Sequence, residues 1–164
     1  MSQYNPMSPK KIDVPLRGLI NYLGLDSTLA THLKYHQPNG FEPEIANCHL
    51  NVLCQIKKAG GRAQHGWVLS QDKPKSFSVA IFHTVWRTPD DQFVDVTPRT
   101  DKEKRLLFVP DSHRTITLTR YEDRPAIDTF NNVCVVGSTI ISPLTEITIE
   151  LSGSFAQDQG LWPW

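Results

Sequence analysis

The hydrophobic pattern of the chain changes at Gly60-Gly61, and this change constrains the fold more than any other feature. Before it, "PLRGLINYLG" (15–24) and "NCHLNVLCQIKKA" (47–59) carry apolar residues at helical spacing, and "DSTLATHLKYH" (26–36) begins with residues that can cap a second short helix. After it, short segments rich in β-branched and aromatic residues alternate with proline and aspartate turns. Helices first and strands afterwards predict an α+β domain in which the helices pack on one face of an antiparallel sheet.

Seven segments after this point have the composition of strands. They cover residues 62–69, 77–88, 92–98, 105–110, 114–121, 132–141 and 145–151. A chain of 164 residues fits a single domain. Residues 1–14 contain two prolines, two serines and few apolar residues, so we expect a flexible arm there and a single domain over 15–164.

Charge and composition restrict the classes of partner. Seventeen basic residues balance seventeen acidic ones, and no basic cluster is interleaved with aromatic residues, so we expect no nucleic-acid partner. No segment approaches the roughly 18 apolar residues of a membrane span, and the start of the chain has no apolar leader. Three cysteines cannot all pair within one chain. These features together predict a soluble cytoplasmic protein with reduced thiols and a small or peptidic partner.

Cys48 stands where a helix is predicted to begin. A helix start stabilises a thiolate, because unpaired backbone N–H groups and the helix dipole point at it. Cys54 in mid-helix and Cys134 in a strand have no such field, and we interpret both as core residues. Asn51 shares the helix face of Cys48 and is a candidate for binding substrate, whereas His49 points about 100° away and is expected at the rim.

A thiol nucleophile needs a base and a group that orients the base, and the segment 77–98 offers both. Alternation places His83 at the end of an apolar strand face, and Asp95 lies in the next, otherwise apolar, strand. A loop of 88–90 would put the two residues directly opposite, and a loop of 89–91 would make them diagonal neighbours. Either register leaves them on one face within reach of a hydrogen bond. Because a buried aspartate is costly without a partner, each residue strengthens the interpretation of the other.

The order of these features resembles a known superfamily. A helix-leading cysteine, a histidine in "HTVW" and an aspartate in "DVTP" are similar to the transglutaminase-like branch of the papain-like cysteine hydrolases. The resemblance covers residues 47–98 and implies an α+β papain-like core with a Cys-His-Asp triad acting on amide bonds. It makes Cys48 the nucleophile, His83 the general base and Asp95 the orienting residue. The combination also resembles a group of uncharacterised bacterial proteins, a likeness that implies no activity.

The resemblance also implies an oxyanion hole and a substrate class. The backbone N–H of Cys48 would supply one donor, and Gln37 and Asn47 are the candidates for a second. The segment "GGRAQHGW" is expected to bring Trp67 close to the helix end, where it would line a cleft. The implied substrate is an amide of a peptide or protein, and the implied chemistry requires no cofactor and no metal.

Two readings from other classes remain open. The same fold could serve as a non-catalytic binding module or effector. A zinc site could use Cys48, His49, His65, His83 and Asp95, which are ligand types, although no CxxC or HExxH spacing organises them. The sequence assigns no role to the tail Trp162-Pro163-Trp164 and does not determine the oligomeric state.

Overall fold

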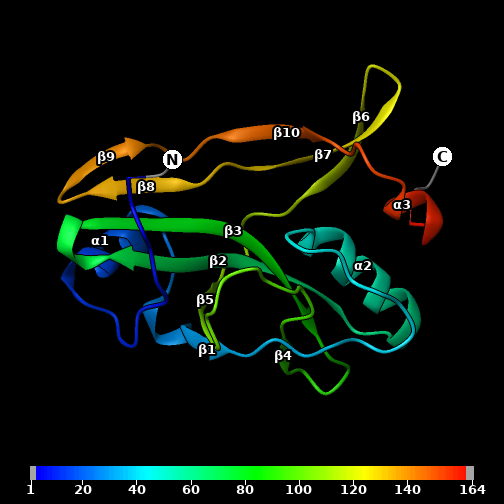
Figure 1. Ribbon diagram of the computed structural model, residues 1–164, viewed down its shortest axis with the longest axis horizontal. Coiled ribbons are helices and arrows are strands. Elements are labelled where there is room, and N and C mark those ends of the chain that lie inside the picture. The colour runs from blue at the N-terminus through cyan, green and yellow to red at the C-terminus, as the bar shows by residue number, and fades with distance from the viewer. Residues whose placement is uncertain (1–2, 162–164) are drawn as a thin grey trace.

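The computed structural model describes residues 3–161 and has the α+β architecture expected from the sequence (Figure 1). The predicted tail Trp162-Pro163-Trp164 lies outside the described residues. The helices are α1 (Val14–Tyr22), α2 (Cys48–Ala59) and the short α3 (Phe155–Asp158), with 3₁₀ turns at Ser27–Leu29 and Lys73–Lys75. The strands are β1 (Thr31–Leu33), β2 (Arg62–Asp72), β3 (Phe77–Arg87), β4 (Phe93–Val94), β5 (Leu106–Pro110), β6 (Thr117–Tyr121), β7 (Arg124–Phe130), β8 (Val133–Val136), β9 (Thr139–Ser142) and β10 (Glu146–Glu150).

The strands form two antiparallel sheets. The larger has the order β1-β5-β2-β3-β8-β9, with β4 as a further partner of β3, and the smaller has the order β10-β7-β6. The long hairpin of β2 and β3, paired from Arg62↔Arg87 to Asp72↔Phe77, forms the centre of the larger sheet. Figure 1 shows the smaller sheet and α3 on the upper side of the molecule, with α2 close to the far end of β3.

The outer edge of β3 changes partner along its length. Because β2 pairs with the whole of β3 on one side, β8 and β4 must both lie on the other side. There β8 pairs with Phe77–Ala80 and β4 with Trp86 and Arg87. Within the described chain, residues 81–85 therefore have no strand on this edge, and α2 packs against β3. This gap in the sheet is where the first residues of α2 lie.

Both N-terminal helices lie on one face of the larger sheet, as predicted. Asp13 caps α1 by accepting a hydrogen bond from the Leu16 amide, and Pro15 stands in its first turn. The apolar side of α1 joins a core cluster that includes Ala80 and Phe82. At the end of α2, the carbonyl of the capping residue Gly60 accepts a hydrogen bond from the Trp86 indole N–H. Residues 80, 82 and 86 of β3 share one face because strand side chains alternate.

The opposite face of the sheet carries a smaller apolar cluster formed by Leu33, Val68, Val85, Leu106 and Phe108. A third cluster joins Leu50 of α2 to Ile127 of β7 and Phe155 of α3. The helix that begins with Cys48 is therefore fixed between the two sheets. Among residues 3–161, no helix has the length and hydrophobicity to cross a membrane.

Three expectations about the fold are corrected. Residues 26–36 form a 3₁₀ turn and β1 rather than a helix, because Thr31–Leu33 pair with β5. The strand expected over 92–98 is limited to Phe93–Val94. β7 was not anticipated, although it is the central strand of the smaller sheet.

The N-terminal arm is not free of the domain. Met7 exchanges backbone hydrogen bonds with Gln71 at the end of β2, at 2.8 and 2.9 Å. The Asn5 amide donates to Asp72, and Tyr4 stacks on Phe77 with ring centroids 4.0 Å apart. The described part of the arm thus packs along the end of the central hairpin.

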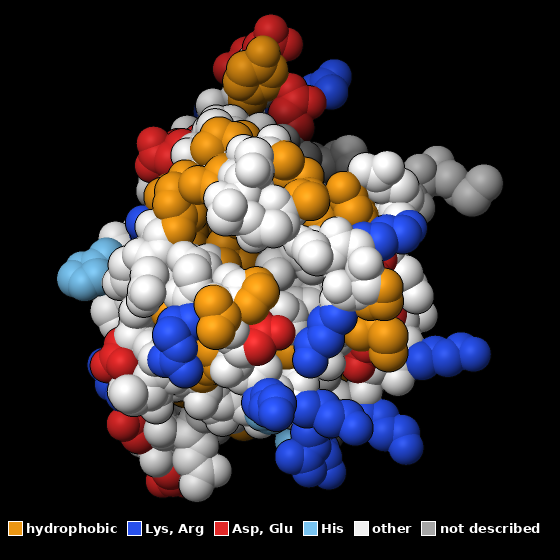
Figure 2. Space-filling model, turned by 90° about the vertical axis from the view of Figure 1, so that its left-hand side faces the viewer, with side chains coloured by type: hydrophobic (Ala, Val, Ile, Leu, Met, Phe, Trp, Pro, Cys, Tyr) orange, Lys and Arg blue, Asp and Glu red, His pale blue; other side chains and the backbone are white. Residues whose placement is uncertain are grey.

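An apolar hollow lies at the end of the sheet remote from α2. It has a volume of about 350 Å³ between α1 and the β8–β9 hairpin, and its lining includes Val14, Tyr22 and Ile140. These three side chains are 83%, 40% and 41% exposed. Figure 2 views this end of the molecule, where hydrophobic side chains gather in the upper half and lysine and arginine side chains in the lower. Since β8 pairs with the first residues of β3, this surface is separate from the start of α2.

Candidate active site

The loop before α2 is held in place from inside the protein. Asn51 is fully buried; its side-chain oxygen accepts from the Glu44 amide at 3.0 Å, and its nitrogen donates to the Glu44 carbonyl at 2.8 Å and to Thr97 at 3.2 Å. Ala46 has a φ of 59°, a conformation that costs a non-glycine residue energy. These contacts fix the point at which the chain enters the helix at Cys48.

The end of α2 also matches its sequence signal. Gly60 and Gly61 have φ values of 74° and 79°, which glycine adopts without strain. A Cβ on Gly61 would come within 2.4 Å of the Arg87 carbonyl, so only glycine allows β3 to approach so closely. The predicted helix boundaries are confirmed to within one residue.

His83 and Asp95 form the predicted pair. His83 Nε2 lies 3.1 Å from Asp95 Oδ1, and their side chains are 10% and 0% exposed. The pairing of Trp86 with Val94 follows the second of the two registers considered, with a loop over 89–91. Asp95 stands just beyond β4, where its carbonyl accepts a hydrogen bond from the His36 amide at 2.9 Å. This backbone hydrogen bond fixes the position of Asp95 and therefore of its carboxylate.

The Asp95 carboxylate is only partly satisfied. Its Oδ1 also accepts from the Thr97 amide at 3.3 Å. Its Oδ2 is buried and has no hydrogen-bond partner among the described residues. A buried carboxylate in this position favours a cationic ring on its neighbour, because the negative charge is otherwise poorly compensated. His83 is the side chain that receives this field.

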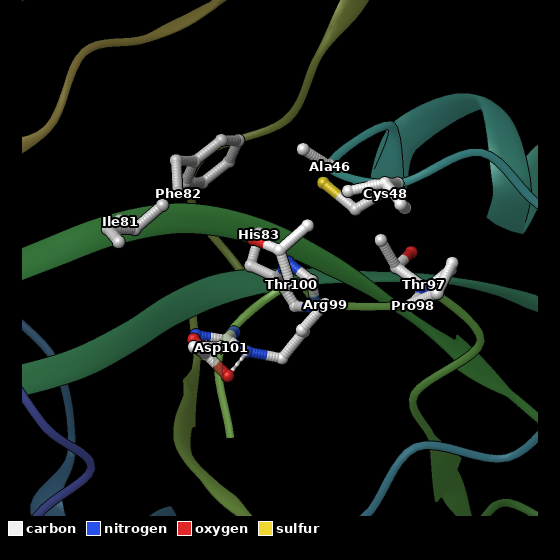
Figure 3. Close-up of a pocket in the computed structure, with 11 residues that line it drawn as sticks. Ala46, Cys48, Ile81, Phe82, His83, Thr97, Pro98, Arg99, Thr100 and Asp101 are labelled. Atoms are coloured by element: carbon white, nitrogen blue, oxygen red, sulfur yellow. Dashed lines mark hydrogen bonds and ion pairs between the residues drawn. The ribbon is translucent and has the colours of Figure 1, made fainter. Parts of the chain in front are cut away.

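Cys48 and His83 shift each other's pKa in opposite directions. Burial raises the pKa of the Cys48 thiol, but the charges of His49 and His83 and their hydrogen bonds outweigh it and bring the pKa well below its usual range. Burial lowers the pKa of His83, but the charge of Cys48 and the hydrogen bond to Asp95 outweigh it and raise the pKa to about 10. A thiolate and an imidazolium are therefore favoured at neutral pH. Figure 3 shows the Cys48 sulfur directed toward β3 beside Phe82 and His83.

The other two thiols have the opposite tendency. Burial raises the pKa of Cys54 and of Cys134. The Cys54 thiol donates to Gln159 at 3.4 Å. Both are free thiols in their usual protonated form, and Cys48 is the cysteine with an environment that activates it.

Cys48 lines two cavities of about 250 Å³ each. The first, drawn in Figure 3, lies between the loop at Ile45 and Ala46 and the segment 97–101, and His83 forms part of its wall. The second extends toward the smaller sheet, and its wall includes His49, Thr129 and Asn47. Although Cys48 is only 8% exposed, a ligand can approach it from both cavities.

His49 does not lie at the rim as predicted. Its Nδ1 is 3.7 Å from the Cys48 sulfur and 2.6 Å from the Thr84 hydroxyl, and its Nε2 is 3.3 Å from the Thr129 hydroxyl. The helix start covers the open edge of β3, so that neighbouring residues of α2 reach opposite faces of that strand. The only signal in the sequence was the position of His49 directly after the nucleophile.

The remaining predicted site residues differ in their placement. Asn47 lines the second cavity, and its side-chain nitrogen donates to Glu44 at 2.7 Å. Gln37 is exposed, accepts from Tyr35 at 2.6 Å and is outside the walls of both cavities. Asn51 is occupied in holding the loop, so it positions the site rather than contacting substrate. The prediction that Trp67 lines a cleft is wrong, because Trp67 is fully buried in the core.

Comparison of the chain with models of protein families, with curated proteins and with solved structures found no match. Among residues 3–161, no group of three or more histidine, cysteine or acidic side chains is arranged to hold a metal ion.

Proposed function

We propose that the protein is a cysteine-dependent hydrolase or acyl transferase that acts on an amide bond through a thioester intermediate, on a papain-like (transglutaminase-like) core. The observation that carries the proposal is a cysteine at a helix start whose pKa is lowered by His49 and by His83, the second of which is bonded to a buried aspartate. A nucleophile, a base and an orienting carboxylate in this relation are the requirements of nucleophilic acyl transfer. The reducing conditions of the cytoplasm, where we expect the protein to act, keep such a thiol available.

The chemistry follows from the charges of the pair. The Cys48 thiolate attacks the amide carbonyl carbon, a C–S bond forms, and the carbonyl oxygen becomes an oxyanion. The His83 imidazolium then gives its proton to the departing amine, the C–N bond breaks, and a thioester remains. Water or a second amine, deprotonated by the now neutral His83, attacks the thioester and releases the thiolate. The Cys48 amide and the Asn47 side chain are the donors nearest in sequence for the oxyanion.

Asp95 acts throughout as the orienting residue. Its contact with Nε2 leaves Nδ1 as the His83 nitrogen that can serve the thiol. Its negative charge stabilises the His83 imidazolium until the ring donates its proton to the leaving amine. We propose an amide of a peptide or protein as the substrate class, since the two cavities flank the sulfur and an extended chain could cross it.

The test is covalent trapping of the acyl-enzyme. The protein is incubated with a pool of peptides, quenched in acid and measured by intact mass, and the adduct is then mapped to its peptide. We expect a thioester on Cys48 in the wild type, no adduct in Cys48→Ser, and a wild-type result in the matched variant Cys54→Ser. An acyl adduct on the wild type that persists unchanged in Cys48→Ser would refute the proposal, and the absence of any adduct on the wild type would favour the binding module.

A further inference from the structure

A second histidine contacts the Cys48 sulfur independently of the His83–Asp95 pair. His83 and Thr84 are neighbours on β3, so their side chains point to opposite faces of the strand. The sulfur lies beside His83, while His49 bonds to Thr84 and is also 3.7 Å from the sulfur. The two imidazoles therefore approach Cys48 from different sides of the strand edge.

The His49 ring is fixed by contacts from two strands, β3 and β7. Thr84 of β3 and Thr129 of β7 each bond to one of its nitrogens. Phe82 packs against it with ring centroids 5.9 Å apart. An imidazole with both nitrogens engaged has a defined orientation, which a residue at the rim of a site would lack.

The hydroxyl of Thr84 restricts the proton positions. It lies 2.6 Å from His49 Nδ1 and 2.8 Å from His65 Nδ1, but it has only one proton to donate. When it donates to His65, it must accept from an N–H at Nδ1 of His49. That same N–H also faces the sulfur, so it can donate a hydrogen bond to a thiolate. An unprotonated Nδ1 would instead place its lone pair beside the anionic sulfur, which is repulsive.

The surrounding titratable groups are compatible with this arrangement. Cys48 on the same helix and His65 on β2 are the ionisable neighbours of His49, and β3 and β7 present the hydroxyls of Thr84 and Thr129. Burial and then the charge of His49 lower the pKa of His65 to about 4, so His65 is neutral and can accept from Thr84. The Cys48 sulfur, 3.7 Å from Nδ1, is thus an anionic neighbour of His49 when the thiol is ionised.

We propose that His49 is a second imidazole partner of the Cys48 thiolate, donating a hydrogen bond from Nδ1 to the sulfur, and that this bond favours the thiolate both in the resting protein and as the leaving group when the thioester is resolved. Its purpose in turnover rests on the proposed function. In acyl transfer, the neutral His83 takes a proton from the attacking water or amine, the C–S bond breaks, and the Cys48 sulfur leaves as a thiolate. His49 stabilises that thiolate without taking part in the proton transfers.

The experiment measures the rate of Cys48 alkylation by iodoacetamide from pH 4 to 9, by mass spectrometry of the Cys48 peptide. The variants are His49→Leu, His49→Asn, which keeps a neutral N–H donor near the Nδ1 position, and His83→Gln. The matched control is His65→Leu, because His65 shares the Thr84 hydroxyl but is joined to Thr84 rather than to the sulfur. Thermal melts confirm that each variant is folded.

We expect His49→Leu to raise the midpoint of the pH profile by about one unit, which is about a tenfold lower rate below the midpoint. His49→Asn should fall between the wild type and His49→Leu. His65→Leu should shift the midpoint less than His49→Leu does, because it removes only the acceptor of the Thr84 proton and leaves the His49 ring beside the sulfur. His49→Leu combined with His83→Gln should approach the profile of an ordinary thiol near pH 8.5.

The inference is overturned if His49→Leu keeps the wild-type midpoint, or if His65→Leu shifts it equally. Should His49→Leu fail to fold, His49→Asn decides alone: a midpoint above wild type supports the proposal and an equal one overturns it. The outcome is separable from that of the proposed function. If the midpoint responds to His49 but the protein forms no acyl adduct, this inference stands and the proposed enzyme is rejected. If the protein forms the adduct but the midpoint does not respond to His49, the proposed enzyme stands and this inference is rejected.

Discussion

Replacement of Asp95 by alanine is the substitution for which the structure gives the clearest expectation. Asp95→Ala removes the acceptor of two hydrogen bonds, one from the His83 ring at 3.1 Å and one from the Thr97 amide at 3.3 Å. Both donors are largely buried, since His83 and Thr97 are 8% and 3% exposed. The variant therefore leaves a buried imidazolium without its carboxylate partner, with the Cys48 thiolate as its neighbouring anion.

The size of the effect follows from the burial of the pair. Breaking a buried ion pair by removing one partner costs about 3 to 5 kcal/mol. The lower end applies here, because Asp95 Oδ2 has no hydrogen-bond partner among the described residues and the carboxylate already carries part of its desolvation cost. For a domain of this size, about 3 kcal/mol corresponds to a fall in Tm of roughly 6 to 12 °C.

The penalty should depend on pH in a defined direction. The pKa of His83 is raised from 6.5 to about 10 in the folded protein, with burial opposing and the charge of Cys48 and the bond to Asp95 prevailing. A raised pKa contributes stability that is fully present below the unfolded value of 6.5 and is lost as the pH rises through about 10. The difference in the free energy of unfolding between wild type and Asp95→Ala should therefore be largest near pH 6 and shrink toward pH 10.

The assay is urea unfolding followed by circular dichroism at pH 6, 8 and 10, with calorimetry at each pH. Asp95→Asn keeps the shape and one acceptor and should lose less stability than Asp95→Ala, while Asp90→Ala, an exposed residue of the same turn, should match the wild type. A Tm for Asp95→Ala within 2 °C of wild type at pH 6, or a penalty that grows toward pH 10, would refute the account of the buried pair.

Four further outcomes are expected. Iodoacetamide at low stoichiometry should label Cys48 before Cys54 or Cys134, because burial raises the pKa of the last two; equal labelling would contradict a tuned thiolate. Cys48→Ser should abolish acyl-adduct formation and change the Tm by less than about 3 °C, since the change is nearly isosteric. Asn51→Ala should lower the free energy of unfolding by about 2 to 4 kcal/mol and also slow Cys48 alkylation, because three hydrogen bonds that hold the preceding loop are lost. An unchanged alkylation rate in a destabilised protein would show that the loop does not control the reactivity of Cys48. Gly66→Ala should be destabilising, measured by urea unfolding, because a Cβ would lie 2.4 Å from a carbonyl of β5; wild-type stability would show that β2 and β5 can separate there.

The parts of the site that were predictable from the sequence are those set by local rules. The start and end of α2 follow from apolar periodicity and the glycine pair, which need no knowledge of the rest of the fold. The contact between His83 and Asp95 follows from strand alternation and a short turn, and both candidate registers led to it. A papain-like core is a larger claim, and it stays a prediction.

The parts that were missed depend on contacts between distant segments. Residues 31–33 read as helical, yet they pair with β5, more than 70 positions later in the chain. The position of His49 depends on how α2 meets the edge of β3, and helix periodicity alone does not specify that docking. Trp67 follows a glycine pair that suggested a cleft, but strand alternation directs it into the core between the helices and the sheet. Tertiary packing decided each of these cases.

The gap in the outer edge of β3 has a consequence for solubility. A strand edge without a partner presents backbone groups that can pair with another chain, and native proteins commonly cover such edges. Here the first turn of α2 lies against the segment between β8 and β4, so the same residues that bear the thiol also shield the edge. Substitutions that loosen this turn would therefore expose the strand edge and promote aggregation, in addition to any effect on the reactivity of the thiol. The residues near Cys48 must both position the thiol and cover the edge of β3.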